Sequence, residues 1–454
     1  MGNHIISGER RLSVGRSAAS ALVIVASMIC SQHRADAAPP DNTVEQWNKI
    51  TEDTVVGAGA FQNEGLIYTA YVSAAVYNAT VAINGRYQPY GEAIVAPRGA
   101  STDAAVVEAA YDTLVHYFPA ATATLYPLYV QALALIPNGT AKDNGQMVGL
   151  TAATNIITQR NGDGRRTPIG VSSAFPTAVP GPGVWRLTPA AYAPPQTPWV
   201  ANVAPFVLQS AAQFLPRPPP SLKSERWVDA VTDIKAFGSV SSGVRTADET
   251  AIAKFWTANV IRQYNRTVRD IADARHLSAL KTARLSAMVN VIGADAQIAV
   301  MYAKYHYLFW RPVTAIDPTS VSPSGDGFGP IPGYDDGNPE TVELVGWRPL
   351  VVTPNHPEYP AAHGSLTSAM AEVFSEFLDT DRIDIDVHGF DAAGAAGNLD
   401  AVRHFRHSRD LRRQIIDARF WAGLHYRFSS EAGVTLGEKV ARYDLAHAFR
   451  ELED

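Results

Sequence analysis

The sequence predicts an all-α fold built from two helical bundles, and three observations support this prediction. Apolar residues recur at three- and four-residue steps through most of the chain, as they do on the buried face of an α-helix. No stretch shows the alternating pattern of a sheet, and the best candidate for a short extended segment is Val351-Val352. A proline-rich stretch, residues 166–221, separates the two helical parts.

The first 37 residues are predicted to be an export signal. Three arginines, the last of them Arg16, precede an apolar run from Ala18 to Cys30 that is too short to span a bilayer. The triplet Ala35-Asp36-Ala37 then fits a signal-peptidase site. We therefore expect a secreted or periplasmic protein. Cleavage removes four arginines and two acids, so that the net charge changes from −6 to −8.

Composition narrows the classes of partner and of chemistry. The 454 residues are 46% hydrophobic, which fits a globular protein with a large core. The only cysteine, Cys30, lies in the signal, so the mature chain has no disulfide, thiol nucleophile or cysteine zinc site. The negative chain has no basic stripe and is not expected to bind nucleic acid. No long apolar run follows residue 37, so no integral membrane segment is expected, and a homo-oligomer stays possible.

Residues 38–165 are predicted to form an N-terminal helical domain without a cluster of titratable side chains. His116 lies on an apolar helical face and is interpreted as a structural histidine. We expect this domain to cover and support the second bundle. The predicted helices are Leu66–Ile83, a helix capped by Ser101 or Asp103 that ends at Phe118, Ala121–Ile136 and Lys142–Arg160.

Residues 166–221 form the predicted connecting segment. Its many prolines break regular structure, whereas Trp185 and Trp199 indicate an ordered strap packed on the surface. A proline-rich recognition segment is the alternative. Residues 222–454 are then the predicted C-terminal catalytic bundle. Its first long helices are expected over Thr246–Ala274 and Ala279–Trp310.

Two cations stand at the end of the second of these helices. Lys304 and Arg311 are seven residues apart, about 700° around a helix, and so share nearly one face. Pro312 is expected to end the helix just after them. An ammonium and a planar guanidinium together suit a tetrahedral oxyanion. The alternative is an ordinary surface pair near a helix end. The later Asp335-Asp336-Gly337-Asn338 is interpreted as a turn, because it lacks the spaced ligands of a calcium loop.

Two later motifs add candidate site residues. In Tyr359-Pro360-Ala361-Ala362-His363 the histidine begins a helix predicted to reach Leu378, and a helix N-terminus favours an anion. Arg419 and His425 are placed on one predicted helix, Asp410–Phe428, about 120° apart around its axis. A capping histidine is the alternative for His363.

Together, Lys-x6-Arg-Pro, Pro-x-x-His and Arg-x5-His resemble the signature of the superfamily that joins type 2 phosphatidic acid phosphatases and vanadium-dependent haloperoxidases. The resemblance covers roughly residues 250–450. It implies His363 as the acid–base residue and His425 as the vanadium ligand or the nucleophile on phosphorus. The oxyanion site that it implies consists of Lys304, Arg311, Ala362, His363, Arg419 and His425.

The chain departs from the family pattern where serine and glycine are usual. Ala361 and Ala362 stand in place of Ser-Gly before the histidine, and Ala418 stands in place of the serine before Arg419. The serine hydroxyl contact to the oxyanion is therefore lost. The backbone N–H of Ala362 remains available unless its φ is positive, and Ser365 is a candidate substitute for the hydroxyl.

A second departure concerns the partner of His425. The family usually has an aspartate four residues after this histidine, and the position is Ser429 here. Loss of the carboxylate lowers the basicity of the imidazole and alters its tautomer preference. Glu431 and Asp444 are candidate replacements. His356, seven residues before His363, is a further candidate for the same pocket.

The resemblance favours the haloperoxidase branch, because an export signal and additional N-terminal helices accompany the motifs. It implies a vanadate cofactor, with hydrogen peroxide and halide as substrates. One alternative is an acid phosphatase that hydrolyses phosphate monoesters through a phosphohistidine, with no cofactor. The other is a non-catalytic secreted scaffold that binds an anion. The expected fold is haloperoxidase-like in each case.

Overall fold

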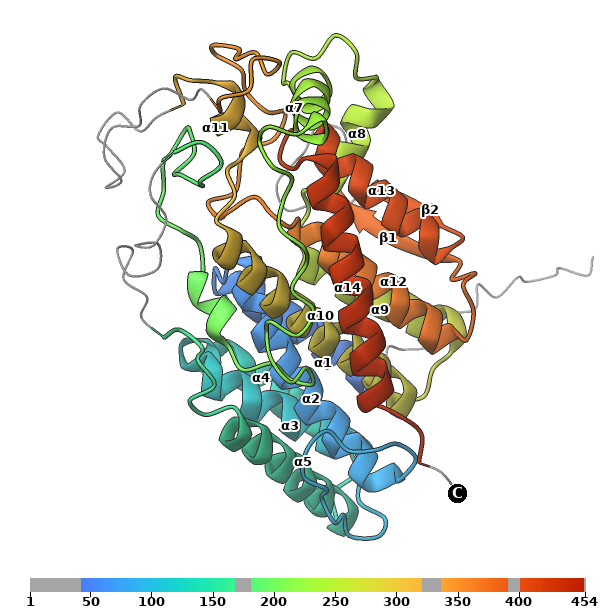
Figure 1. The fold of residues 1–454 in the computed structure, drawn as a ribbon. Coiled ribbons are helices and arrows are strands. Elements are labelled where there is room, and N and C mark those ends of the chain that lie inside the picture. Colours follow the sequence, from blue (N-terminus) through green and yellow to red (C-terminus); the bar gives the residue numbers. More distant parts are fainter. Residues whose placement is uncertain (1–41, 168–180, 321–335, 391–400, 453–454) are drawn as a thin grey trace, which may run out of the picture. The chain divides into compact units, whose positions relative to one another are not determined.

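The computed structural model describes residues 42–167, 181–320, 336–390 and 401–452. The predicted export signal, with Cys30, and Asp335 lie outside these residues. Within them the chain is helical apart from loops and one short hairpin, which confirms the all-α prediction (Figure 1). The N-terminal helices are α1 (Thr43–Gly57), α2 (Gln62–Asn84), α3 (Thr102–Tyr117), α4 (Thr122–Ala134) and α5 (Thr140–Gln159), with the 3₁₀ turn η1 (Pro119–Ala121) before α4.

Side chains at the helix starts explain several of these boundaries. Asn42 caps α1 by accepting bonds from the N–H groups of Val44 and Glu45. Ser101 caps α3 in the same way through the N–H of Ala104, as its position predicts. These caps satisfy amides that have no acceptor inside the helix.

The connecting segment is ordered over its described part. It contains a short 3₁₀ helix, η2 (Pro198–Asn202), and it runs beside the end of α10. Trp185 is buried against Leu308, and its backbone N–H donates to the Leu308 carbonyl at 2.6 Å. Further along, Asp295 of α10 accepts three consecutive backbone N–H bonds from residues 206–208 at 2.6–3.0 Å. The strap is thus fixed to α10 by buried contacts.

The C-terminal part contains most of the remaining elements. The predicted helix Thr246–Ala274 is in fact two, because Asn259 caps a new helix through the N–H groups of Ile261 and Arg262. The helices are α7 (Glu225–Phe237), α8 (Ala247–Phe255), α9 (Val260–Arg275), α10 (Ala279–Tyr307), α11 (Pro312–Ile316), α12 (Ala362–Leu378), α13 (Ser408–Trp421) and α14 (Arg427–His447).

One antiparallel hairpin was not predicted. Strand β1 (Ile385–Gly389) pairs with β2 (Ala401–Phe405), and Ile385 stands opposite Phe405. The alternation in β1 is regular, with Ile385, Val387 and Gly389 buried. Five residues are too few for this pattern to stand out from a helical sequence.

Helix α10 lies at the centre of the core. Its buried side chains join those of α2, α3 and α12 in one hydrophobic cluster, so both helical parts contribute to the same core. By length and composition α2 and α10 could each cross a membrane, but 89% and 94% of these apolar windows are buried inside the protein. The division at residues 165 and 221 stays a prediction.

Helices α12 and α14 approach each other closely through glycines of α14. A Cβ atom on Gly437 would collide with the carbonyl oxygen of Ser365, and one on Gly433 with that of Ala361. Because Ala361 is the N-cap of α12, this contact fixes the point at which α12 begins. His363 lies in its first turn.

Candidate active site

Lys304 and Arg311 come from different elements. Helix α10 ends at Tyr307, where Leu308 adopts a left-handed conformation with φ 50°, and Arg311 is the N-cap of α11. The prediction of one shared helical face was therefore wrong. Pro312 starts a new helix at its first position, where proline is favoured, rather than ending the previous one. Both side chains nevertheless end in one buried region.

The Lys304 ammonium is completely buried and is held by backbone. Its Nζ donates to the carbonyl oxygens of Pro357 at 2.9 Å and Glu358 at 2.8 Å. An ammonium has three N–H donors, so one stays free for another acceptor. Burial and the neighbouring Arg311 charge hold the pKa of Lys304 well below its usual range.

The Arg311 guanidinium is fixed from several sides. Its Nε donates to the His356 carbonyl at 3.0 Å, and its Nη1 to the Leu424 carbonyl at 2.9 Å. It also donates to two imidazole nitrogens, His425 Nε2 at 3.1 Å and His356 Nδ1 at 3.0 Å. Burial lowers its pKa to about 10. His356, a candidate from the sequence, therefore does lie in this pocket, as a support for Arg311.

Arg419 and His425 do not share a helix, which corrects the predicted helix Asp410–Phe428. Helix α13 ends at Trp421, and Gly423 follows with φ 74°. A Cβ on Gly423 would collide with the Gly238 carbonyl oxygen, so only glycine fits this turn. His425 lies in the loop between α13 and α14.

Arg419 is the least engaged of the three cations. Its Nη1 donates to the Trp256 carbonyl at 3.2 Å. Its Nε is buried and has no hydrogen-bond partner among the described residues. Burial, and then the charge of Arg311, lowers the pKa of the guanidinium to about 9. A buried donor without an acceptor is costly, so this group favours a bound anion.

His425 has a carboxylate partner that the sequence did not suggest. Its Nδ1 lies 2.8 Å from Oε1 of Glu358, and its Nε2 lies 3.1 Å from Nη1 of Arg311. A guanidinium can only donate, so Nε2 must accept and Nδ1 must carry the proton. This tautomer places the single Nε2 lone pair on the side of Arg311, where a ligand would take it in place of the Arg311 N–H.

Glu358 replaces the aspartate that the family pattern leads one to expect near His425. It is fully buried, and its Oε1 also accepts the Tyr426 N–H at 3.1 Å. Burial raises the pKa of Glu358 to about 7, although Lys304 and Arg311 oppose the shift. The 67 residues that separate Glu358 from His425 conceal the pairing in the sequence.

The candidate replacements named from the sequence do not reach His425. Glu431 is on the surface, 3.7 Å from the guanidinium of Arg226. Asp444 is buried beside Asp295, near the C-terminal end of α14, whereas His425 lies before the N-terminal end of that helix. Spacing along one helix was a poor guide, because the true partner belongs to the segment before α12.

His363 lies at the start of α12, as predicted. Its Nε2 is buried without a partner among the described residues. Burial, with the charges of Arg419, Lys304 and Arg311, keeps the pKa of its imidazole well below the usual range. The neutral ring therefore has one nitrogen available for proton transfer.

The two alanines before His363 form the helix start. Ala361 is the N-cap, and its N–H donates to the Ser429 carbonyl at 3.1 Å. Ala362 is the first helical residue and does not have a positive φ, so its N–H lies among the free amides of the first turn. Ser365 does not replace the missing hydroxyl, because its Oγ donates to the Ala296 carbonyl at 3.2 Å.

The charges within this site do not balance. Three cations face one carboxylate, so a net positive charge is buried unless an anion is present. The unpartnered Nε of Arg419 and Nε2 of His363 fit the oxygens of an anion such as vanadate or phosphate. We call this group of side chains the cage. Its members are Lys304, Arg311, His356, Glu358, His363, Arg419 and His425.

Comparison with known proteins identifies the fold that holds these side chains. The family model for the VCPO second helical-bundle domain matches residues 284–454. A vanadium chloroperoxidase from Curvularia inaequalis is 24% identical over 298 residues, 52% of this chain. The alignment spans 48% of that enzyme, about half its length.

Solved structures match over more of the chain. A bacterial vanadium-dependent iodoperoxidase has a TM-score of 0.71 and 22% identity, over 92% of this chain and 100% of that one. A holo-type bacterial vanadium-dependent chloroperoxidase has a TM-score of 0.62 and 18% identity, over 90% and 95% of the two chains. The resemblance inferred from the three motifs is therefore confirmed: the chain has the fold of the vanadium-dependent haloperoxidases, and residues 284–454 match their second helical-bundle domain.

Proposed function

We propose that this chain is a vanadium-dependent haloperoxidase that oxidises halide with hydrogen peroxide. The observation that carries the proposal is the unbalanced charge of the cage. Lys304, Arg311 and Arg419 are all buried, and Glu358 is the one carboxylate that contacts a cage histidine among the described residues. An oxyanion of multiple charge offsets this cost, and vanadate is such an anion.

Each cation has a distinct part in holding the oxyanion. Arg311 is fixed by four hydrogen bonds, which leave it one Nη2–H, and it contributes mainly its charge. Among the described residues, Lys304 has two acceptors for its three N–H groups and the Nε of Arg419 has none. These three groups would hold the oxygens of bound vanadate, and His425 Nε2 would be the imidazole nitrogen that meets it. Bound vanadate supplies a Lewis acid that activates hydrogen peroxide.

His425, in the loop before α14, and His363, at the start of α12, have different roles. Glu358 holds the Nδ1 proton of His425 and so keeps the Nε2 lone pair directed at the cage. His363, neutral at working pH because of its lowered pKa, accepts or returns a proton at Nε2. The first-turn amides of α12, including that of Ala362, add positive potential without charge.

Export is part of the proposal. The Arg-rich start, the apolar run and Ala35-Asp36-Ala37 together support cleavage before Ala38 and a secreted or periplasmic location. Expression with the native N-terminus, followed by N-terminal sequencing of exported protein, tests this. Retention of residues 1–37 in the exported chain contradicts it.

The activity test pairs two assays on the exported protein, each with and without orthovanadate. One assay follows bromination of an organic acceptor by hydrogen peroxide and bromide, and the other follows hydrolysis of a generic phosphate monoester. We expect bromination that requires vanadate and falls by on the order of 1,000-fold or more in His425→Ala. His404→Ala is the control, since His404 is paired with Asp384 and Asp386 on the hairpin.

Two other outcomes replace this proposal with an alternative. Ester hydrolysis that vanadate inhibits, without bromination, identifies a phosphatase in which His425 Nε2 attacks phosphorus. Vanadate binding without turnover in either assay identifies an anion-binding scaffold. The same histidine variant separates these cases, since it abolishes hydrolysis in the first and weakens only binding in the second.

A further inference from the structure

Helix α4 has an unusual surface for its sequence. Of its thirteen residues, only Leu125 and Leu133 are buried, although most of the others are apolar. Tyr126 is 55% exposed, Val130 46% and Leu135, just after the helix, 79%. No described part of the chain covers these side chains. A solvated helix normally places charged and polar residues on its outer face, and α4 does not.

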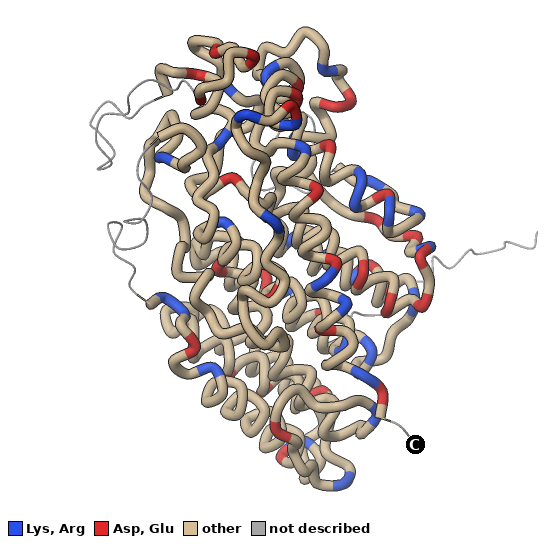
Figure 2. The backbone as a smooth tube through the Cα atoms, in the orientation of Figure 1, with Lys and Arg blue, Asp and Glu red and all other residues tan. Residues whose placement is uncertain are grey.

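The same stretch carries no charge. From Tyr117 to Ala141 the sequence contains no aspartate, glutamate, lysine or arginine over 25 residues, in a chain whose net charge is −6. Figure 2 shows α4 without a charged position, in contrast with helices such as α13. Apolar patches of this kind on a soluble protein mark interaction surfaces.

Helix α5 extends this surface. Gln146 of α5 donates to the Tyr129 hydroxyl of α4 at 3.1 Å, which ties the two helices together. Leu150 lies one helical turn beyond Gln146 on the same face and is exposed, as is the neighbouring Met147. The uncovered apolar area therefore spans two elements.

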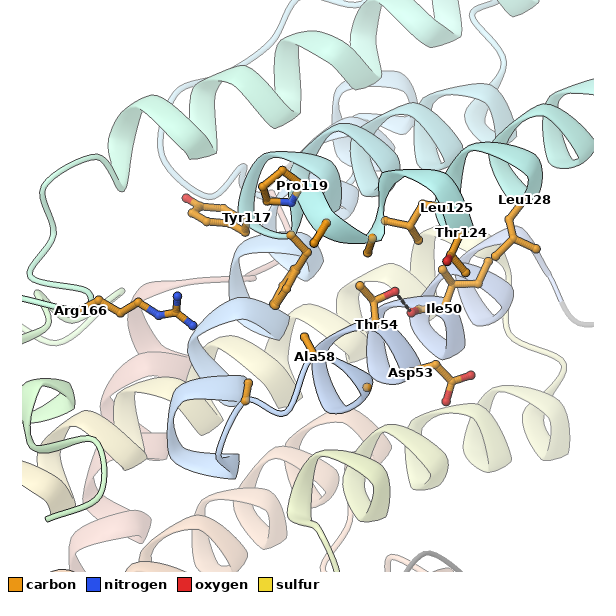
Figure 3. Close-up of a pocket in the computed structure, with 15 residues that line it drawn as sticks. Ile50, Asp53, Thr54, Ala58, Tyr117, Pro119, Thr124, Leu125, Leu128 and Arg166 are labelled. Carbon is orange, nitrogen blue, oxygen red and sulfur yellow. Dashed lines mark hydrogen bonds between the residues drawn. The ribbon is translucent and has the colours of Figure 1, made fainter. Parts of the chain in front are cut away.

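Two hollows lie beside α4 on this surface. Along its first half, α4 borders a cavity of about 660 Å³, which Ile50 and Thr54 of α1 line opposite Leu125 and Leu128 (Figure 3). Beside the second half lies a hollow of about 590 Å³, lined by residues that include Val130, Leu135 and Lys142. Helix α4 is thus a ridge with a hollow next to each half.

We propose that this surface, the α4 face, pairs with the α4 face of a second copy of the chain about a two-fold axis. A two-fold interface must be complementary to itself, and a ridge flanked by hollows meets this condition when two ridges pack side by side. The absence of charge matters for the same reason. Elsewhere two copies of a negative chain repel each other, whereas helix α4 itself brings no charge to the contact, and the charged Asp53, Arg166 and Lys142 lie in the hollows beside it.

Other occupants fit less well. A small apolar ligand in either hollow would leave Tyr126 exposed, because Tyr126 lines neither of them. Helices that lie on membranes carry Lys or Arg on the polar side of the apolar face, and α4 has neither. The α4 face shares no residue with the cage, so this inference does not depend on the proposed function.

The first test is sedimentation equilibrium of the full chain over a range of concentrations, in the wild type and in Tyr126→Glu/Val130→Glu. We expect a wild-type dimer whose dissociation constant rises by on the order of 100-fold or more in the variant, because two pairs of like charges then meet. Val95→Glu is the matched control, since Val95 is 96% exposed outside the face. Unchanged circular dichroism establishes that the variant folds.

The second test reports on the face directly. In a chain with Cys30→Ser, Val130→Cys and Val95→Cys each provide the sole thiol. We expect maleimide to label position 130 more slowly as protein concentration rises, with no such change at position 95. A wild-type monomer up to about 100 µM, a dimer that survives the double glutamate variant, or labelling of position 130 that ignores concentration overturns the proposal.

Discussion

The cage and the α4 face invert the usual distribution of side chains in opposite senses. In the cage, two arginines and a lysine are buried with one carboxylate. On the α4 face, large apolar side chains are exposed and helix α4 itself carries no charge. Each arrangement opposes folding, because buried cations lose hydration and exposed apolar groups gain nothing from the core.

The two inversions point to different compensating ligands. A buried positive charge is offset by an anion of matching shape, and an exposed apolar ridge is offset by another apolar surface. Sequences that follow local rules elsewhere and break them at one place do so most often at functional sites. If the comparison holds, variants of the cage should change anion binding and leave association unaffected, and variants of the α4 face should do the reverse.

The strongest test of the cage removes its least engaged cation. Arg419→Met should weaken orthovanadate binding on the order of 100-fold, since charge-assisted bonds to the oxyanion are lost. Without any oxyanion, the same change should raise the free energy of unfolding by roughly 1 to 4 kcal/mol, because a poorly compensated buried charge is removed. Calorimetric titration and thermal unfolding measure the two effects.

Arg409→Met is the control for this substitution. Arg409 is on the same helix and its side chain is 77% exposed, so its loss should leave binding and stability nearly unchanged. An Arg419→Met protein that binds vanadate normally, or one that is less stable without an anion, would mean that the cage is not under electrostatic strain.

Glu358→Gln asks whether the carboxylate tunes His425. The amide oxygen of glutamine can still accept hydrogen bonds from the His425 Nδ1–H and the Tyr426 N–H. The geometry is therefore kept while the negative charge is lost. We expect vanadate-dependent turnover or vanadate affinity to fall roughly 10- to 100-fold. Steady-state kinetics measure the change, with Glu376→Gln on the exposed face of α12 as the control. An equal loss of turnover or vanadate affinity in both variants would mean that the Glu358 carboxylate does not tune His425.

The motifs identified most of the cage, but not how the chain assembles it. The spacing within the three motifs, together with their resemblance to the superfamily signature, made Lys304, Arg311, His363, Arg419 and His425 candidates. The predicted shared helices were wrong because Leu308 and Gly423 adopt positive φ and end helices inside the motifs. Gly423 was a recognisable stop signal, whereas a leucine in the left-handed region follows from tertiary contacts that no propensity reveals.

Glu358 shows what a motif search overlooks. It lies between Pro357 and Tyr359, directly before the block that contains His363, and an acid in such an apolar and proline-containing run could have attracted attention. Its pairing with His425 depends on two segments that meet only in the fold. The α4 face was missed differently, since a helical apolar pattern indicates burial and says nothing of whether a neighbour is present.

Gly433→Ala tests the scaffold that holds the cage. The added Cβ would collide with the Ala361 carbonyl oxygen, which is backbone and cannot rotate away. We expect a loss of about 1 to 3 kcal/mol in the free energy of unfolding and a lower turnover, because the start of α12 must shift. Gly57→Ala is the control, since a Cβ there meets nothing within 4 Å. Denaturant titration showing equal stability for both variants would contradict this role for the α12–α14 contact.

The smallest expected effect is on the pH dependence of stability, and it comes from two buried carboxyl groups. Asp444 and Asp295 lie together in the core, and both oxygens of Asp444 lack a donor among the described residues. Burial, and then Asp295, raises the pKa of Asp444 well above its usual range, and burial raises that of Asp295 to about 6. The folded state therefore binds more protons than the unfolded state above about pH 4.

It follows that stability falls as pH rises through this range, by at most about 1.4 kcal/mol per pH unit for one proton. Asp444→Asn should remove part of that decline, which unfolding curves from pH 4.5 to 8 measure against Asp233→Asn on an exposed face. An undiminished slope would mean that the pair shares no proton. Carboxyls can escape buried charge by binding a proton, but the arginines of the cage cannot lose theirs at any physiological pH. This difference is why the core pair can become neutral without a ligand, whereas the arginines of the cage keep their positive charge.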